Sequence, residues 1–274
     1  MKYGIIGTGN MGSAFARVLA RAGNEVLIFD HHPEKMQVLV DDVGAVVASA
    51  EEISSSCDAI VMAIKPQVFP AVLAEMAPIV QARCAQGSVF VIITMAAGIT
   101  IATVQSALGV AVPTIRIMPN TPLLVDKGMV AYSVADFDGL PKESAAYQVL
   151  VNFCQAMGNA GEIVEVEEKD MDAVVAVSGS GPAFVYAFID ALIQGGVQCG
   201  LDEKTARVLA AQTVLGAAVM VQRSDEDPGV LAERVCSPGG TTIEGMMALK
   251  AGDFETTVKR AVQATRDRSV ELSR

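Results

Sequence analysis

Tryptophan is absent from the sequence, and histidine occurs only twice in 274 residues. The two histidines are the neighbours His31 and His32, which follow a predicted strand far along the chain from any candidate nucleophile. A Ser-His-Asp triad and a multi-histidine metal site both need histidines at particular places in the fold. The sequence therefore argues against a histidine-based hydrolase, and we expect no metal site.

Paired cysteines are lacking as well. The chain has five cysteines and no C-x-x-C pair, so neither a disulfide framework nor a zinc knuckle is indicated. They are scattered at Cys57, Cys84, Cys154, Cys199 and Cys236. Reduced thiols of this kind are typical of the cytoplasm, and we expect a cytoplasmic location.

Basic residues and long apolar runs are also scarce. Lysine and arginine number 20 against 31 aspartates and glutamates, which gives a net charge of −11. Nucleic acids and anionic membranes bind basic faces, so we expect neither as a partner. Uninterrupted apolar runs such as Val89–Met95 are much shorter than the roughly 20 residues of a membrane-spanning helix. The start, MKYGIIG, lacks the basic and apolar regions of a secretory leader.

What the sequence does contain is a regular alternation of apolar runs and helical patterns. Strands are predicted at 2–6, 25–29, 45–47, 59–63, 89–93, 113–117, 129–133 and 160–166, and helices at 12–22, 33–40, 68–80, 100–108 and 147–156. This order predicts a parallel sheet with helices on both faces. From residue 168 onward the pattern is helical throughout. We therefore predict an α/β protein, with a Rossmann dinucleotide-binding domain over residues 1–167 and an all-α domain over residues 168–274.

The helical half has more apolar faces than it can bury alone. Phe184–Gly195 and Lys204–Gln222 are apolar on more than one side, and a helix of that kind has to be buried. A crowded monomer core is one explanation, and an interface of interleaved helices between subunits is the other. We favour the second, which makes residues 168–274 a dimerisation domain.

A glycine-rich segment follows the first predicted strand. It reads Gly7-Thr8-Gly9-Asn10-Met11-Gly12 and opens the first predicted helix. In a G-x-G-x-x-G of this context, the first glycine permits a tight turn, the second lets a pyrophosphate approach, and the third packs helix on strand. The alternative is a glycine-rich turn without a ligand. The expected cofactor-binding residues here are Ile6, Gly7, Gly9, Asn10, Met11 and Gly12.

Asp30 ends the second predicted strand, about 20 residues past the glycines, where an acid accepts a hydrogen bond from the adenosine ribose. This position favours NAD over NADP, because no arginine lies beside it to hold a 2′-phosphate. His32 and Lys35 are the alternative phosphate ligands, and a solvated aspartate is the plain alternative. Both Asp30 and His32 are counted as cofactor-binding residues.

Two more loops are expected to line the same pocket. Ala63-Ile64-Lys65-Pro66 and Met118-Pro119-Asn120-Thr121-Pro122 each follow a predicted buried strand. In open α/β sheets, ligands bind beyond the carboxyl ends of the strands. Ala63, Lys65, Pro66 and Asn120 are therefore predicted to contact the cofactor, although Lys65 is equally consistent with an ordinary surface lysine.

A third turn is predicted to hold an anion. Ser237–Gly240 separates two helical patterns, and Thr241 begins a T-x-x-E capping box with Glu244. The free N–H groups of the helix start, together with the threonine hydroxyls, form a possible carboxylate receptor. A well-capped turn that binds nothing is the alternative.

These motifs, in this order, resemble the pyrroline-5-carboxylate reductase family. The resemblance rests on the segments 7–12, 63–66, 96–98, 118–122, 177–182 and 228–244. It implies a Rossmann domain followed by a helical domain that dimerises, with dimers assembling into decamers. It also implies reduction of 1-pyrroline-5-carboxylate to L-proline by NADH or NADPH, the last step of proline biosynthesis.

The resemblance also assigns roles to individual residues. It implies that the turn from Ser237 to Thr242 holds the substrate carboxylate and that the Thr242 hydroxyl contacts the ring nitrogen. The expected substrate-binding residues are Ser237, Gly239, Gly240, Thr241, Thr242 and Glu168, the catalytic residues are Thr242 and Ser178, and Ala97 joins the cofactor-binding set. Asp30 departs from the small or neutral residue common in the family, which puts the family's frequent NADP preference in doubt.

The scarcity of histidine suits imine chemistry. Oxidation of an alcohol needs a positioned general base, and Ser178-Gly179-Ser180-Gly181-Pro182 stands where related hydroxy-acid dehydrogenases place a lysine. A protonated imine is already an electrophile, and orientation alone supplies roughly 7–11 kcal/mol of barrier reduction. Gly179, Gly181 and Pro182 are predicted to break the helix and admit the substrate, or to kink it for packing alone. The competing functions are another imine or hydroxy-acid reductase of this architecture and a non-catalytic nucleotide sensor.

Overall fold

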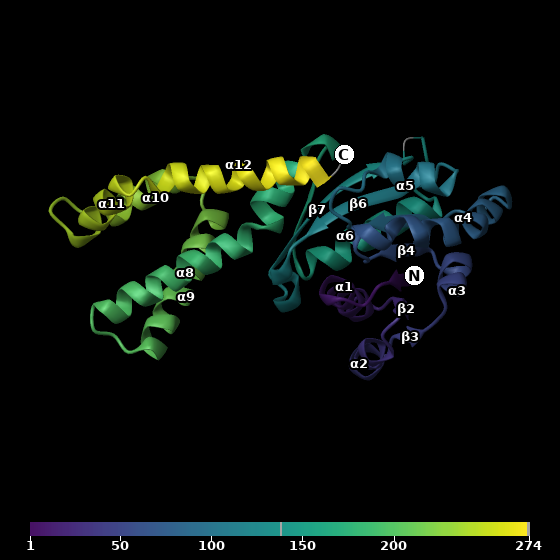
Figure 1. Ribbon diagram of the computed structural model, residues 1–274, viewed down its shortest axis with the longest axis horizontal. Coiled ribbons are helices and arrows are strands. Elements are labelled where there is room, and N and C mark those ends of the chain that lie inside the picture. Colours follow the sequence, from purple (N-terminus) through teal and green to yellow (C-terminus); the bar gives the residue numbers. More distant parts are fainter. Residues whose placement is uncertain (138, 273–274) are drawn as a thin grey trace. The chain divides into compact units, whose positions relative to one another are not determined.

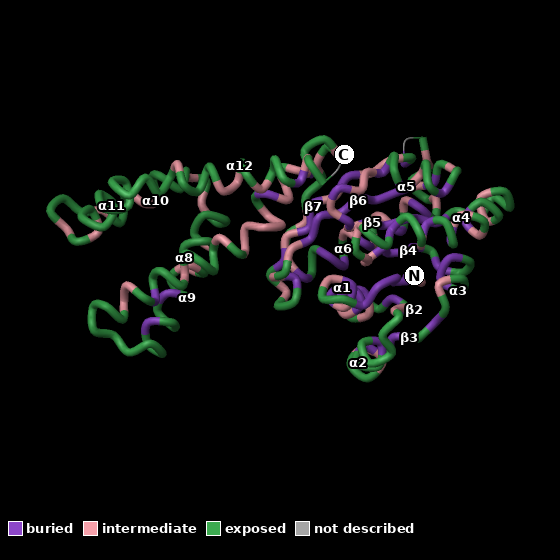
Figure 2. Tube along the Cα trace, in the orientation of Figure 1, coloured by how far each residue is buried: buried purple, intermediate pink, exposed green. Residues whose placement is uncertain are grey.

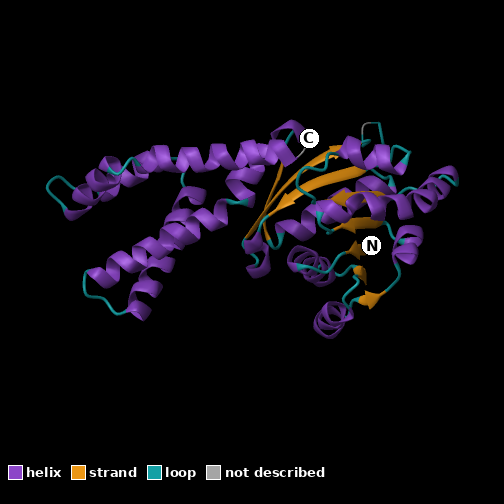
Figure 3. Cartoon of the chain, viewed as in Figure 1, coloured by secondary structure: helices purple, strands orange, loops and turns teal. Residues whose placement is uncertain are grey.

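The computed structural model describes residues 1–137 and 139–272 of the chain. Contacts divide it into two compact units, one of Met1–Ser180 with the segment from Thr265 onward and one of Gly181–Ala264. The units are described separately below, and Figures 1 and 3 show their elements. The domain boundary that we expect after Glu167 stays a prediction.

The first unit is built on one eight-stranded sheet in the order β3-β2-β1-β4-β5-β6-β7-β8. Its strands are β1 (Lys2–Ile6), β2 (Glu25–Phe29), β3 (Val46–Val47), β4 (Ala59–Met62), β5 (Val91–Thr94), β6 (Thr114–Pro119), β7 (Gly128–Ala135) and β8 (Gly161–Glu165). The strands from β1 to β6 run parallel to one another. The residues of β4, β5 and β6 are all buried; β4 and β5 are almost entirely apolar, whereas β6 includes Arg116.

Helices cover both faces of this sheet. They are α1 (Asn10–Arg21), α2 (Pro33–Val43), α3 (Ala50–Ser56), α4 (Phe69–Ala85), α5 (Ile101–Leu108), α6 (Ala145–Gly158) and α7 (Met171–Val174). Short 3₁₀ turns lie at η1 (Pro66–Val68), η2 (Thr121–Val125) and η3 (Glu168–Asp170), and η4 (Val175–Gly179) is a π-helix. One core contains Phe15 and Phe153 of α1 and α6, and the other contains Phe69 of α4 and Val104 of α5. The strands between them are the most buried part of the trace in Figure 2.

The expectation of a wholly parallel sheet is wrong at β7, which runs antiparallel to β6. Residues 120–127 join the two strands, and a parallel connection needs a crossover of a dozen or more residues. The short connection therefore forces the chain to reverse. β8 then pairs with β7 in parallel, after the crossover through α6.

The second unit is entirely helical. It contains α8 (Gly181–Gln198), α9 (Glu203–Arg223), α10 (Pro228–Val235), α11 (Thr241–Ala251) and the first part of α12 (Phe254–Leu272), whose end belongs to the first unit. In that end, the Ser269 hydroxyl donates to Asp172 Oδ1 over 2.6 Å.

Most apolar side chains of the second unit are exposed in the single chain (Figure 2). Its buried cluster consists of Ile193, Ala206 and Ala210 between α8 and α9. Tyr186 and Val208 are 60% and 62% exposed. The crowded monomer core is therefore wrong for the described residues of this unit, and the apolar faces are left for another partner to cover.

Three helical stretches, 66–85, 168–198 and 203–223, are long and apolar enough to cross a membrane by length and composition alone. The expectation that short apolar runs exclude such helices is wrong by this criterion. Polar residues interrupt the runs but leave the average hydropathy of each helix high.

Candidate active site

The glycine loop lies between the end of β1 and the start of α1. Gly7 has a φ of +97°, and a side chain there would come within 2.5 Å of the Ala63 carbonyl oxygen. A Cβ on Gly12 would lie 2.0 Å from the Gly7 carbonyl oxygen. A Cβ on Gly9 would have no atom within 4 Å, and Gly9 caps α1 without a side-chain hydrogen bond. The loop thus has two glycines required by close backbone contact and one that faces open space, beside the free N–H groups of a helix start.

Asp30, directly after β2, is held by hydrogen bonds from within the chain. Its Oδ2 accepts from the Thr8 backbone N–H at 2.7 Å and from the Thr8 hydroxyl at 3.1 Å. Its Oδ1 accepts from the His32 N–H at 3.0 Å and lies 2.9 Å from His32 Nδ1. Burial alone would raise the pKa of Asp30, but the hydrogen bonds from Thr8 and His32 outweigh it and lower the pKa to about 2. Sequence reasoning missed the contact with Thr8, which ties the glycine loop to β2.

The other predicted cofactor loops lie at the same edge of the sheet as the glycine loop. Ala63 follows β4, Ala97 follows β5 and Asn120 follows β6, and these parallel strands are neighbours of one another. Lys65 is exposed, and Pro66 begins η1 directly after it. The carboxyl ends of adjacent parallel strands are where open α/β sheets bind dinucleotides.

Asn120 connects the end of β6 to the π-helix η4. Its Oδ1 accepts from the Met129 backbone N–H at 2.9 Å. Its Nδ2 lies 3.2 Å from the Ser178 carbonyl oxygen and 3.4 Å from Ser178 Oγ, and donates toward both. Two residues predicted from separate motifs, Asn120 and Ser178, therefore lie side by side at the edge where the dinucleotide is expected.

The helix around Ser178 is widened, which corrects the expectation of a break. Residues 175–179 form a π-helix, in which the Ser180 N–H donates to the Val175 carbonyl at 2.8 Å, and α8 continues from Gly181. A Cβ on Gly179 would meet only ordinary contacts with Met118, at 3.7 Å. Single π-turns inside α-helices are frequent at functional sites.

Glu168, a predicted substrate ligand, lies in a brace between three elements. Its Oε1 accepts from Arg116 Nη1 of β6 at 3.0 Å and from the Ile101 N–H at the start of α5 at 2.8 Å. The Arg116 side chain is only 5% exposed, and its Nε has no hydrogen-bond partner among the described residues. Sequence reasoning missed Arg116, because a single charged residue inside a predicted buried strand gave no indication of its partner.

The turn between α10 and α11 belongs to the second unit. Gly239 has a φ of +71°, and the Gly240 N–H donates to the Ser237 carbonyl at 2.9 Å. The predicted capping box is wrong, because α11 begins at Thr241 with Gly240 as its N-cap and no side-chain cap bond. Thr241 and Thr242 are the first two helical residues, so their N–H groups have no partner within the helix. The absence of a side-chain cap leaves these donors available to an anion.

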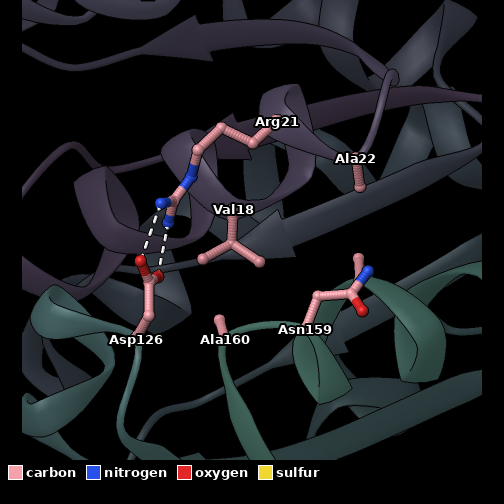
Figure 4. Close-up of a pocket in the computed structure, with 7 residues that line it drawn as sticks. Val18, Arg21, Ala22, Asp126, Asn159 and Ala160 are labelled. Carbon is pink, nitrogen blue, oxygen red and sulfur yellow. Dashed lines mark hydrogen bonds and ion pairs between the residues drawn. The ribbon is translucent and has the colours of Figure 1, made fainter.

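Metal-ligand clusters give no further candidate in the part of the chain that the structure describes. Within residues 1–137 and 139–272, no three His, Cys, Asp or Glu side chains are grouped as a metal site would need. A hollow of about 190 Å³ is lined by Val18, Ala22, Asn159 and the ion pair of Arg21 with Asp126. Figure 4 shows these side chains. The hollow contains none of the predicted site residues. A separate hollow, lined by Ser133, Glu165 and Glu168, does include a predicted substrate ligand, Glu168.

Comparison with known proteins adds the family. A family described as "Pyrroline-5-carboxylate reductase dimerisation" matches residues 168–272, and one described as "NADP oxidoreductase coenzyme F420-dependent" matches residues 2–97. The chain is 36% identical over 277 residues to pyrroline-5-carboxylate reductase of Arabidopsis thaliana, covering 99% of this chain and 95% of the relative. The chain belongs to the pyrroline-5-carboxylate reductase family.

Solved structures of pyrroline-5-carboxylate reductases have the same fold. The Plasmodium falciparum enzyme with NADP bound matches with a TM-score of 0.85 and 30% identity over 100% of this chain and 98% of that one. The Coxiella burnetii enzyme matches with a TM-score of 0.86 and 28% identity, over 99% and 98%. The predicted family and the predicted fold class, a Rossmann domain followed by a helical dimerisation domain, are confirmed.

Proposed function

We propose that this chain reduces 1-pyrroline-5-carboxylate to L-proline by hydride transfer from NADH or NADPH to the carbon of the cyclic imine, the last step of proline biosynthesis. The observation that carries the proposal is identity of 36% with a pyrroline-5-carboxylate reductase over essentially the whole of both chains. The open glycine loop of one unit and the free N–H donors at a helix start of the other support the proposal.

The glycine loop fits a dinucleotide. Open space at Gly9 and uncapped N–H groups at the start of α1 suit a pyrophosphate, whose negative charge is stabilised at a helix N-terminus. A bound nicotinamide dinucleotide supplies the hydride. Lys65, Ala97 and Asn120, on loops after three neighbouring strands, are proposed to complete the pocket.

The Ser237–Thr242 turn is proposed to bind the substrate carboxylate. Its two glycines have no side chains that would cover the backbone. The N–H groups of Thr241 and Thr242, in the first turn of α11, have no partner within the helix. We assign the Thr242 hydroxyl to the ring nitrogen and Ser178 to the reacting end of the substrate. Glu168 stays a proposed substrate ligand only through its second carboxylate oxygen, because Oε1 already accepts from Arg116 and Ile101.

The cofactor preference is proposed to favour NADH. Asp30 has a strongly lowered pKa, so it is charged at neutral pH and repels a 2′-phosphate. The Plasmodium relative was solved with NADP, however, and His32 and Lys35 are the groups here that suit a phosphate. His32 lies against Asp30, and its ring is 57% exposed, so it has room to turn toward either ribose or phosphate.

The proposed assembly is a homodimer through the helical unit, with dimers associating into a decamer in the cytoplasm. The match of residues 168–272 to a dimerisation family supports association of copies. The net charge of −11 supports the absence of nucleic-acid and anionic-membrane partners.

The test is oxidation of NADH and of NADPH by the purified chain, with and without 1-pyrroline-5-carboxylate. Substrate-dependent oxidation that yields proline supports the proposal. Oxidation or reduction driven instead by a 2-hydroxy or 3-hydroxy acid would assign a different reductase of the same architecture. Dinucleotide binding without turnover of either substrate class would indicate a nucleotide sensor.

A further inference from the structure

The orientation of the Asn120 amide is fixed by groups that have only one hydrogen-bonding role. The Met129 N–H is a donor, so the atom 2.9 Å from it must be the amide oxygen. The Ser178 carbonyl is an acceptor, so the atom 3.2 Å from it must be the amide nitrogen. The Nδ2 atom therefore faces Ser178 as a donor.

The sequence explains why the Ser178 carbonyl needs this donor. In a regular α-helix, the carbonyl of residue 178 would accept from the N–H of residue 182. Residue 182 is proline, which has no N–H. Asn120 takes the place of that missing donor, from a strand end far away in the sequence.

The same amide determines what the Ser178 hydroxyl can do. Nδ2 also donates toward Ser178 Oγ at 3.4 Å, so the hydroxyl proton cannot point at Asn120. Serines in helices commonly donate to a carbonyl four residues earlier, as Ser54 does to Ala50 at 2.7 Å. The Ser178 hydroxyl donates to no acceptor among the described residues, and the side chain is half-buried at the edge that carries the cofactor loops.

We propose that Asn120 is a positioning residue, which holds the Ser178 hydroxyl with its proton directed at the nitrogen of the substrate. The inference rests on the proposed function. Asn120 acts through Ser178, whose carbonyl has no N–H at residue 182 to pair with.

Reduction of the protonated imine needs no separate proton donor. Hydride from NADH or NADPH forms a C–H bond at the carbon of the protonated imine, and the cofactor is oxidised. The C=N π bond breaks, and its electron pair becomes a lone pair on nitrogen. The Ser178 hydroxyl donates a hydrogen bond to this new lone pair and keeps its own proton. A donor aimed where charge density develops stabilises the transition state more than the bound substrate.

The experiment is a double-mutant cycle of Asn120→Asp and Ser178→Ala, measured as kcat and KM for 1-pyrroline-5-carboxylate. A carboxylate at position 120 still accepts from Met129 but turns the Ser178 proton toward itself. We expect each single variant to lower kcat on the order of tenfold to a hundredfold, with smaller changes in KM. In the Ser178→Ala background, Asn120→Asp should add less than about a twofold loss. Asn159→Asp, the same change at an exposed helix end, is the matched control and should keep wild-type kcat.

A pH profile gives a second readout. A protonated carboxyl can donate to Ser178, so the kcat deficit of Asn120→Asp should shrink as pH falls from about 6 through the ordinary aspartate pKa of about 3.9. Asn120→Thr is neutral and removes both amide contacts, and it replaces Asn120→Asp in the cycle if the charged variant fails to fold.

Several outcomes would overturn the inference. Multiplicative losses in the cycle would mean that Asn120 does not act through Ser178. A loss of dinucleotide affinity as large as the loss of kcat would show that the effect of Asn120→Asp arises in the cofactor pocket and not through Ser178. Absence of any turnover of 1-pyrroline-5-carboxylate by the wild-type chain would overturn the proposed function itself, which separates the two failures.

Discussion

The carboxylate of Asp30 has four acceptor positions, and donors from Thr8 and His32 already occupy them. A ribose hydroxyl therefore has to displace one of these donors in order to bind. The exposed His32 ring is the one that can leave without disturbing the backbone. Asp30 thus has two roles, one in fixing the glycine loop and one in choosing the cofactor.

The first prediction concerns cofactor choice. Asp30→Ser removes a negative charge beside the expected 2′ position. The kcat/KM for NADPH should therefore rise about tenfold relative to the kcat/KM for NADH. The measurement is the ratio of the two kcat/KM values before and after the change. An unchanged ratio would show that Asp30 serves only to hold the loop.

The second prediction concerns stability in acid. The folded pKa of Asp30 is about 2 against an ordinary value of 3.8, so its hydrogen bonds contribute fully above about pH 4 and are lost as pH falls toward 2. After allowance for solvent screening, we expect Asp30→Asn to remove about 1 kcal/mol from the free energy of unfolding at neutral pH. Urea unfolding from about pH 5 to pH 2 should show the variant and wild type converging. Parallel curves across this window would contradict the assignment.

The third prediction concerns Thr242, at the second position of α11. Loss of one hydrogen bond to the ring nitrogen should lower kcat/KM for the imine by roughly tenfold to a hundredfold in Thr242→Ala. Nucleotide affinity and the thermal midpoint should stay nearly unchanged.

Thr241→Ala is the matched control for Thr242→Ala. Because Gly240 and not Thr241 caps the helix, loss of the Thr241 hydroxyl should change stability by less than about 0.5 kcal/mol. Wild-type kcat/KM in Thr242→Ala, or activity lost only through unfolding, would show that the hydroxyl does not orient the substrate.

At the scale of single residues, the sequence predicted which residues belong to the candidate site better than it predicted their hydrogen-bond partners. The spacing of Gly7 to Gly12 and of Asp30 follows from local backbone requirements, which nearby residues determine. The contacts Thr8–Asp30, Asn120–Ser178 and Arg116–Glu168 join segments that no spacing rule connects. The capping box failed for a local reason, because Gly240 supplied the extended residue before the helix one position earlier.

At the scale of elements, Glu168 determines how η3, β6 and α5 are joined. Its carboxylate is shared by Arg116 of β6 and the Ile101 N–H of α5. The Arg116 guanidinium is buried, and a buried charge that loses its partner costs about 3 kcal/mol or more. The loop that carries Ala97 leads directly into α5, so this brace also lies next to the proposed cofactor pocket.

The fourth prediction follows from this brace. Glu168→Ala should lower the free energy of unfolding by about 3 kcal/mol, because Arg116 stays buried without a counter-charge. Glu168→Gln should lower the free energy of unfolding by less, because its amide oxygen can still accept from the Ile101 N–H. Glu167→Ala is the control, since its pair with Lys169 is exposed and worth about 0.5 kcal/mol at most. Loss of kcat with unchanged stability in Glu168→Ala would favour the substrate-ligand assignment instead.

The sequence predicted most strands and helices of the first unit but missed where the sheet reverses. Continuous Val and Ile runs gave β4 and β5, whereas α3 is too short for its apolar pattern to be recognised. The direction of β7 depends on the length of the connection after β6, for which the sequence predicts only a loop that lines the cofactor pocket. No local signal in the sequence indicates the π-turn at 175–179, and the bond from Asn120 to the Ser178 carbonyl joins segments far apart in the chain.

At the scale of the whole molecule, the dominant fact is apolar area that one chain leaves uncovered. Val208, Leu209 and Leu215 of α9 and Tyr186 of α8 are 50% or more exposed. Two environments can cover helices of this length and hydropathy, namely a membrane and further copies of the chain. The match to a dimerisation family over residues 168–272 favours copies.

The last prediction is that the chain is an obligate oligomer without detergent. Exposed apolar patches of this extent on a monomer promote association, and interleaved helices would bury them in a shared core. Light scattering at micromolar concentration should give at least twice the chain mass of 28.6 kDa, and ten times the chain mass if dimers form decamers.

Leu209→Glu places a charge in the uncovered face and should shift the measured mass downward with loss of activity. Arg207→Gln, at an ion-paired polar position of the same helix, should change neither. A fully active species of 28.6 kDa would contradict the prediction, and recovery of the protein only with membranes or detergent would assign the apolar helices to a bilayer.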